Sequence, residues 1–317
     1  MTTRADHMVT GDPGFEIFVR EVAPPEPSGV SVLLVHGGGP GGLASFDLPV
    51  PGYSVAEDIA SAGHPVYVMD VRGWGRSTRP AALEQPLDAN PPAVSSEEAI
   101  RDIAAVVGWL HQRRDGEPVA LIGWATGGHW CGMYASRHPD RVSHLVMLNS
   151  LYGVAAPWAL RAAFEDPDRP GEPSRSLGAY RRLTRANVVA SWDRAIPVED
   201  KTQWRVPSVT GAFLDAVVGD TAAGEMRVPA GFQLESYLMA RGLRYWDAGD
   251  IRVPTLVARG DLDHWSRPED LLALQRELLN APKVTTLTIA GGTHYLFLDR
   301  PDRGRDRFIR EVVSFLA

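Results

Sequence analysis

The sequence has little of what would place it in a specialised class. Cysteine occurs once in 317 residues, which excludes an internal disulfide and favours a reducing compartment, the cytoplasm. No run of 18 apolar residues is present, so a membrane-spanning helix is not expected. The first residues include no apolar segment typical of a signal peptide. Basic residues are outnumbered, and the net charge of −7 argues against a nucleic-acid or anionic-membrane partner.

The composition that remains is typical of a folded globular protein, with 44% hydrophobic and 22% charged residues. Strand patterns, several of them continuous apolar runs that suit a parallel sheet buried on both faces, alternate with helix patterns. The predicted strands occupy residues 15–20, 30–35, 65–70, 119–122, 142–148, 253–258 and 283–289. The predicted helices occupy residues 55–62, 95–114, 130–138, 269–279 and 303–315. This alternation predicts an α/β protein with an open, mostly parallel sheet.

Residues 151–250 interrupt the alternation. The segment is dense in proline, arginine and tryptophan, and it has helical patches but no run typical of a buried strand. Because the strand pattern resumes at residue 253, we interpret the segment as an insertion. We therefore predict a core domain of residues 1–150 and 251–317, with a cap of residues 151–250.

The stretch 123–128, Gly-Trp-Ala-Thr-Gly-Gly, joins a predicted strand to a predicted helix. A strand, a tight turn flanked by glycines and a helix form the context of a nucleophile elbow, G-x-S-x-G. The glycines suit a strained turn that brings helix and strand close together. The position of the nucleophile, however, holds Ala125, and a methyl group cannot attack a carbonyl.

A second glycine-rich stretch, residues 36–39 (His-Gly-Gly-Gly), follows another predicted strand. Acyl transfer requires N–H donors for the oxyanion of the tetrahedral intermediate. The backbone N–H groups of Gly38 and Thr126 are the predicted donors.

An acid and a base follow two later strands. Residues 260–263 offer Asp261 and Asp263 as acids, and residues 291–294 end in His294 as the base. Each feature alone could be structural, for example an aspartate that caps the next helix. Together their order, nucleophile then acid then histidine, is that of an α/β-hydrolase.

The chain resembles the α/β-hydrolase superfamily over roughly residues 15–317. Four motifs carry the resemblance: the oxyanion loop 36–41, the D-x-R-G-x-G-x-S signature at 70–77, the G-x-x-D acid motif at 260–263, and the histidine motif at 291–294 with 299–301. The acid motif selects Asp263 over Asp261. The resemblance implies a mostly parallel eight-stranded sheet flanked by helices, with an inserted helical cap.

A narrower resemblance concerns bacterial esterases that hydrolyse monoalkyl phthalates, on the basis of chain length, elbow position and oxyanion loop. It implies a small-molecule ester as substrate, no metal or cofactor, and a monomer or homodimer. The oxyanion loop also resembles that of the meta-cleavage-product hydrolases, so C–C bond hydrolysis stays open, as do other esters, thioesters and lactones.

Three interpretations of Ala125 compete. It is an engineered replacement of the catalytic serine, or the mark of a natural pseudohydrolase that binds without turnover, or part of a site that uses only His294 and Asp263. Loss of a triad nucleophile costs about 10⁶ in turnover. The chain is therefore expected to bind substrate and to be nearly inert.

A substrate with a free carboxylate requires a cationic partner, and arginine is the best suited. The candidates for this role are Arg161 and Arg259, with His129 and His264 as helpers. Trp124, Trp158 and Trp265 are the candidates for an apolar pocket that holds the alkyl group, and Gly39 is a further candidate for substrate binding. The alternative for each arginine is a surface ion pair, and for each tryptophan a place in the core.

Overall fold

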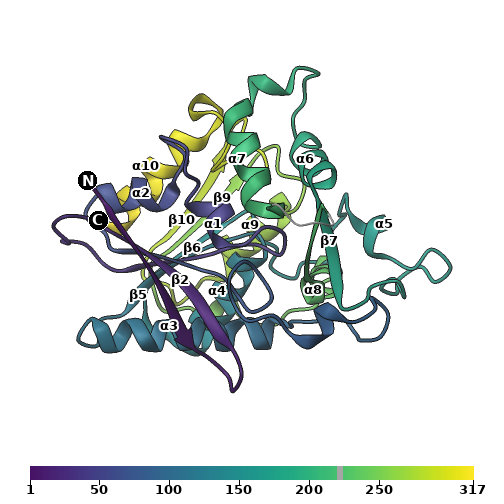
Figure 1. Cartoon of the computed structure of the whole chain (residues 1–317), viewed down its shortest axis with the longest axis horizontal. Coiled ribbons are helices and arrows are strands. Elements are labelled where there is room, and N and C mark those ends of the chain that lie inside the picture. The colour runs from purple at the N-terminus through teal and green to yellow at the C-terminus, as the bar shows by residue number, and fades with distance from the viewer. Residues whose placement is uncertain (220–223) are drawn as a thin grey trace.

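The computed structural model describes residues 1–219 and 224–317. Its centre is an eight-stranded sheet with the order β1-β2-β4-β3-β5-β6-β9-β10 (Figure 1). The strands are β1 Thr3–Thr10, β2 Glu16–Ala23, β3 Val32–Val35, β4 Val66–Met69, β5 Val119–Trp124, β6 Val142–Leu148, β9 Thr255–Gly260 and β10 Val284–Ile289. Strands β4 to β10 in this order are parallel, whereas β1 and β2 are antiparallel additions. The predicted mostly parallel sheet is confirmed.

Burial explains which strands were predictable. All residues of β3, β4 and β5 are buried, as expected for continuous apolar strands covered on both faces. Strand β1 was not predicted, because it lies at the edge of the sheet and seven of its eight residues are at least partly exposed. Its sequence therefore lacks an apolar run.

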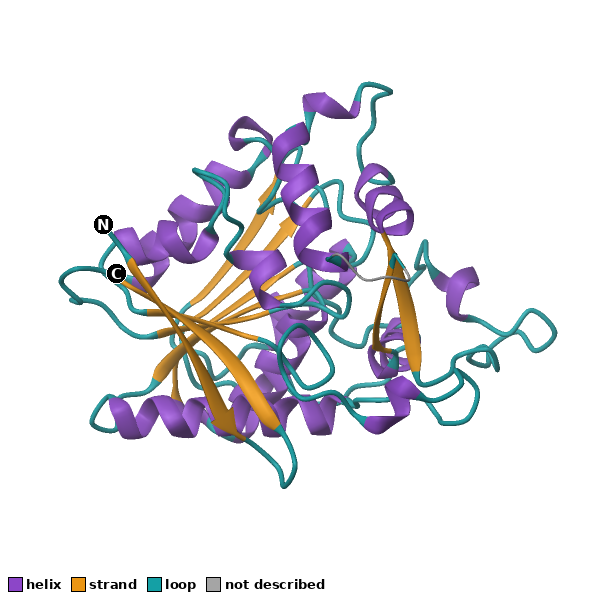
Figure 2. Cartoon of the chain, viewed as in Figure 1, coloured by secondary structure: helices purple, strands orange, loops and turns teal. Residues whose placement is uncertain are grey.

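Helices cover both faces of the sheet (Figure 2). Helices α3 and α4 pack together on one face, and α2 packs with α10 on the other. The helices outside the insertion are α1 Gly42–Phe46, α2 Val55–Ser61, α3 Ser96–Arg113, α4 Thr126–Arg137, α9 Pro268–Glu277 and α10 Arg305–Leu316. The 3₁₀ helices are η1 Ala81–Glu84, η2 Pro139–Arg141, η3 Lys201–Gln203, η4 Ala248–Asp250 and η5 Pro301–Arg303. The N-terminus of α3 is fixed by a capping box between Ser95 and Glu98.

Most of the segment between β6 and β9 lies on the right in Figure 1, whereas residues 207–218 reach back to the upper centre and contact α1. It contains α5 Arg161–Phe164, α6 Arg185–Asp193, α7 Pro207–Val218 and α8 Gly231–Ala240. It also contains an antiparallel two-stranded sheet of β7 Tyr180–Thr184 and β8 Glu225–Pro229. The expectation of a purely helical cap is therefore incomplete. The boundaries of the cap, residues 151–250, stay a prediction.

No helix in the described part of the chain is long and apolar enough to cross a membrane.

Candidate active site

The turn between β5 and α4 is a nucleophile elbow in its backbone geometry. Ala125 has φ 52° and ψ −116°, a conformation that costs a non-glycine residue about 1–3 kcal/mol. Added Cβ atoms at the flanking glycines would overlap backbone, at Gly123 the carbonyl of Gly127 and at Gly127 the carbonyls of Val35 and His36. The strained turn is thus formed with alanine at its tip.

His294 and Asp263 form a buried pair beside this turn. The Nδ1 atom of His294 lies 2.7 Å from Oδ1 of Asp263. The same carboxylate accepts hydrogen bonds from the backbone N–H of Trp265 and from the backbone and hydroxyl of Ser266. Burial acts to raise the pKa of Asp263, but the charge of His294 and these hydrogen bonds outweigh it and hold the pKa below its usual value. An ionised Asp263 keeps the proton of His294 on Nδ1 and leaves Nε2 as a base.

The loop after β3 lies directly against the elbow. A Cβ at Gly37 would stand 3.2 Å from the Cβ of Ala125. The indole of Trp74 holds the loop by donating a hydrogen bond of 2.9 Å to the carbonyl of Gly39. Thr126 is the first residue of α4, so its N–H has no acceptor within the helix. The oxyanion roles of Gly38 and Thr126 stay predictions.

A cavity of about 290 Å³ opens over the elbow. Eight of the predicted site residues line it: Gly38, Gly39, Trp124, Ala125, Thr126, His264, Trp265 and His294. Asp263 lies behind His294. The sequence-based site is therefore brought together around one cavity.

Four predicted substrate residues do not line this cavity, and their predicted role is corrected. Arg161 is exposed and pairs with Glu165 at 2.6 Å, so it is the surface ion pair that the alternative described. Arg259 is buried and donates to the backbone carbonyls of Asp263 and Ser266. It therefore supports the loop that carries the acid.

The other two corrected residues are also structural. His129 is buried between the indole of Trp246, which donates to its Nδ1, and the hydroxyl of Ser96 at 3.0 Å from its Nε2. Burial lowers the pKa of His129 to about 3, so the ring is neutral at pH 7. The indole of Trp158 donates to the carbonyl of Trp265 and supports that residue from behind.

Two arginines that were not predicted line the cavity from the insertion. Arg181 lies on β7, and Arg194 follows α6. Within the described part of the chain, neither guanidinium has a carboxylate within 4.0 Å. Burial lowers the pKa of Arg181, and the charge of Arg194 adds to this effect. An arginine remains protonated despite such a shift, so the cavity contains unpaired positive charge.

His264 completes the polar lining next to His294. Burial, followed by the charge of His294, lowers the pKa of His264 to about 3. Its Nδ1 is buried and has no hydrogen-bond partner among the described residues. The ring is therefore neutral at pH 7, and its buried Nδ1 does not face the open part of the cavity.

Asn149 and Asp299 hold the histidine loop, and sequence reasoning missed their function. The Nδ2 of Asn149 donates to the carbonyls of Thr293 and His294, and its Oδ1 accepts from the N–H of Gly260. The carboxylate of Asp299 accepts from the backbone and hydroxyl of Thr293 and from the indole of Trp192 in α6. The position of Asn149 at the carboxyl end of a predicted strand was the available signal.

A family model described as "alpha/beta hydrolase fold" matches residues 31–301. The human 1-acylglycerol-3-phosphate O-acyltransferase ABHD5 is 27% identical over 305 residues, which cover 89% of this chain and 76% of the relative. The human (lyso)-N-acylphosphatidylethanolamine lipase is 28% identical over 159 residues, which cover 50% of this chain but only 37% of the lipase.

Among solved structures, a meta-cleavage product hydrolase from Pseudomonas fluorescens, crystallised as a serine-to-alanine mutant with acetates, has a TM-score of 0.62. It is 17% identical, and the match covers 98% of this chain and 96% of that one, so the likeness concerns the fold alone. The family model, by contrast, covers most of the sequence together with the elbow, acid and histidine stretches. This chain belongs to the α/β hydrolase family.

Proposed function

We propose that the chain is a serine carboxylic ester hydrolase in which Ala125 occupies the place of the nucleophile. The observation that carries the proposal is the buried pair of Asp263 and His294 beside a strained elbow. A protein that only binds a ligand has no physical need for an oriented base or for a positive φ at alanine. Both features serve a serine hydroxyl at the tip of the turn.

The mechanism applies to the form with serine at position 125. Its Oγ attacks the ester carbonyl while Nε2 of His294 takes the hydroxyl proton, and Asp263 stabilises the imidazolium. The C–O bond to the alcohol then breaks, and His294 returns the proton to the leaving oxygen. Water attacks the acyl-enzyme by the same proton path and releases the acid. Backbone N–H groups of Gly38 and Thr126 bind the oxyanion, at about 2.7–4 kcal/mol for each donor.

The proposed substrate is a monoester of an aromatic dicarboxylic acid, such as a monoalkyl phthalate. Its free carboxylate pairs with Arg181, and with Arg194 at the rim, in place of the two arginines that the sequence suggested. An unpaired guanidinium in a partly apolar cavity favours a bidentate carboxylate partner. Aromatic walls from Phe164, Phe232 and Trp265 suit the aromatic ring.

A second candidate function is ligand binding without turnover, and the observation that favours it is Ala125 itself. C–C bond hydrolysis of a meta-cleavage product is a third candidate, because it would use the same base and oxyanion donors. Its structural support is the fold-level likeness to a meta-cleavage product hydrolase.

The test is to replace Ala125 by serine. We expect Ala125→Ser to hydrolyse p-nitrophenyl acetate and monobutyl phthalate about 10⁶ times faster than the parent. The double variant Ala125→Ser with His294→Ala serves as control and should lose this gain. If the serine form cleaves only a meta-cleavage product, the C–C hydrolase is correct. If it cleaves none of these substrates and still folds, ligand binding without turnover replaces the proposal.

A further inference from the structure

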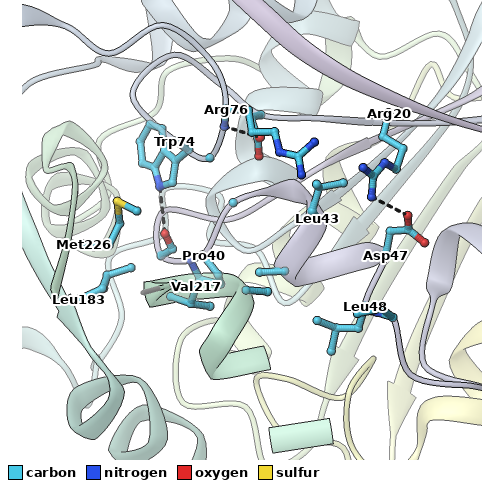
Figure 3. Close-up of a pocket in the computed structure, with 18 of the residues that line it drawn as sticks. Arg20, Pro40, Leu43, Asp47, Leu48, Trp74, Arg76, Leu183, Val217 and Met226 are labelled. Atoms are coloured by element: carbon cyan, nitrogen blue, oxygen red, sulfur yellow. Dashed lines mark hydrogen bonds and ion pairs between the residues drawn. The ribbon is translucent and has the colours of Figure 1, made fainter. Parts of the chain in front are cut away.

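A second cavity of about 850 Å³ lies on the other side of the loop that follows β3 (Figure 3). The insertion contributes one wall through α7, β7 and β8, and α1 with the residues after it contributes the other. The apolar side chains on these walls are Leu43, Leu48, Leu183, Val217, Met226 and Val228. The cavity therefore has an apolar part between the insertion and α1, and a charged end.

The charged residues at one end of this cavity already have partners. Arg20 and Arg4 both pair with the buried Asp47, and Arg76 pairs with Asp6 at 2.8 Å. Figure 3 shows Arg20 beside Asp47, well away from Met226 and Leu183. Because these cations are compensated, this cavity differs from the cavity over the elbow, where Arg181 is unpaired. It suits an uncharged apolar group.

Gly39 and Pro40 line both cavities. An added Cβ at Gly39 would meet no atom within 4 Å, so there is open space beside this residue. The hydrogen bond from Trp74 to the carbonyl of Gly39 fixes the backbone on the side of the second cavity. Both cavities therefore adjoin this short piece of loop.

Strand β7 contributes to both cavities from the opposite side. Arg181 lines the cavity over the elbow, whereas Leu183 lines the second one. Residues two apart on a strand point to the same face and stand about 7 Å apart. Leu183 also faces Met226 across the β7–β8 ladder. One face of this small sheet therefore runs from an unpaired cation to an apolar wall.

We propose that the second cavity binds the alkyl chain of the ester's alcohol part, which passes beside Gly39. The inference rests on the proposed function and assigns a binding place to the alkyl chain of that substrate. The cavity over the elbow, at about 290 Å³, is at the lower limit of small-molecule pockets, whereas the second cavity has about 850 Å³. The carboxylate at Arg181 and the chain along Leu183 then match the two ends of one amphiphilic molecule.

The first experiment uses the protein as it is, because Ala125 prevents turnover. Monomethyl, monobutyl, monohexyl and mono-octyl phthalate are titrated by calorimetry. We expect Kd to fall by up to about fourfold for each added methylene, the value for full transfer from water. Equal Kd values along the series would overturn the alkyl-chain site and leave the proposed function intact. If no ester binds, both are overturned.

The second experiment locates the chain. Met226→Trp fills the second cavity. We expect it to weaken the binding of mono-octyl phthalate at least tenfold, while the methyl ester binds with unchanged Kd. Arg182→Trp is the matched control, since it puts the same ring on the opposite, exposed face of the β7–β8 sheet. A thermal melt verifies that each variant is folded. If folded Met226→Trp binds both esters like the control, the chain lies elsewhere and the inference is wrong. If Met226→Trp does not fold, Leu43→Trp repeats the test from the opposite wall, because Leu43 lines the second cavity and not the cavity over the elbow.

Discussion

Replacing Arg181 by glutamine tests the most specific feature of the site, an unpaired cation in the cavity over the elbow. The substitution keeps a polar side chain of similar length and removes the charge. We expect weaker binding of a phthalate monoester, since the carboxylate loses its charge-assisted hydrogen bonds. A neutral diester has no such interaction and should bind the variant and the parent equally.

The size of the effect follows from the surroundings of Arg181. The side chain is partly buried and has no carboxylate within 4.0 Å among the described residues, so a ligand carboxylate does not have to displace an existing partner. A hydrogen bond to a charged group contributes about 1.5–3 kcal/mol. A loss of about 2–3 kcal/mol corresponds to a Kd raised about 30- to 150-fold.

The same substitution should not destabilise the free protein. Burial of a cation without a partner is unfavourable, so Arg181→Gln is expected to melt at the same temperature as the parent or higher. Most residues that support a fold behave in the opposite way. The combination of weaker binding with unchanged or greater stability is therefore characteristic of a ligand-binding role.

The assay is calorimetric titration of monobutyl phthalate and dibutyl phthalate into the parent, Arg181→Gln and Arg182→Gln. Arg182 is the matched control, because it is the next residue on β7, is exposed and pairs with Glu225. An equal loss of affinity for both ligands in Arg181→Gln would refute the reasoning. The same loss of affinity for monobutyl phthalate in Arg182→Gln would also refute it.

Two further predictions concern the residues behind His294. In the Ala125→Ser background, Asp263→Asn should lower kcat about 10⁴-fold, the known cost of the wrong histidine tautomer in such a triad; stopped-flow or steady-state rates check this, and a loss below tenfold would contradict the role of Asp263. Burial raises the pKa of Asp299 to about 7, so between about pH 4 and pH 7 the native protein binds a proton that the unfolded chain has lost. Stability should therefore decrease as the pH rises through this range, by at most about 1.4 kcal/mol per unit. Chemical denaturation of the parent and Asp299→Asn measures the difference; parallel curves would show that Asp299 stays ionised.

The grouping of the site residues was predictable because each site motif directly follows a strand, and the ends of these strands can be predicted from the sequence. The carboxyl ends of parallel strands meet at one edge of a sheet, so motifs after β3, β5, β9 and β10 had to come together. The acid was the clearest case, since Asp263 lies 2.7 Å from His294 whereas Asp261 is exposed and accepts a hydrogen bond from the N–H of Gly291.

The choice of arginines failed for a physical reason. Proximity in sequence to the acid loop suggested Arg259, but the strand turns this side chain inward to backbone carbonyls. Proximity to the start of the insertion suggested Arg161, which has Glu165 one helical turn away. Arg181 had no such local signal, because strand β7 is short and its partner β8 follows about 40 residues later.

The sequence by itself determined the sheet, the order of the site residues and the strained turn at Ala125. Apolar runs, glycines and polar residues at strand ends are local features, and each acts within a few residues. The tertiary structure alone decided which charges are paired, which cavity each arginine faces, and that the loop at Gly39 adjoins two cavities. Pairing and cavity shape depend on contacts between segments far apart in the chain, and no local pattern encodes them.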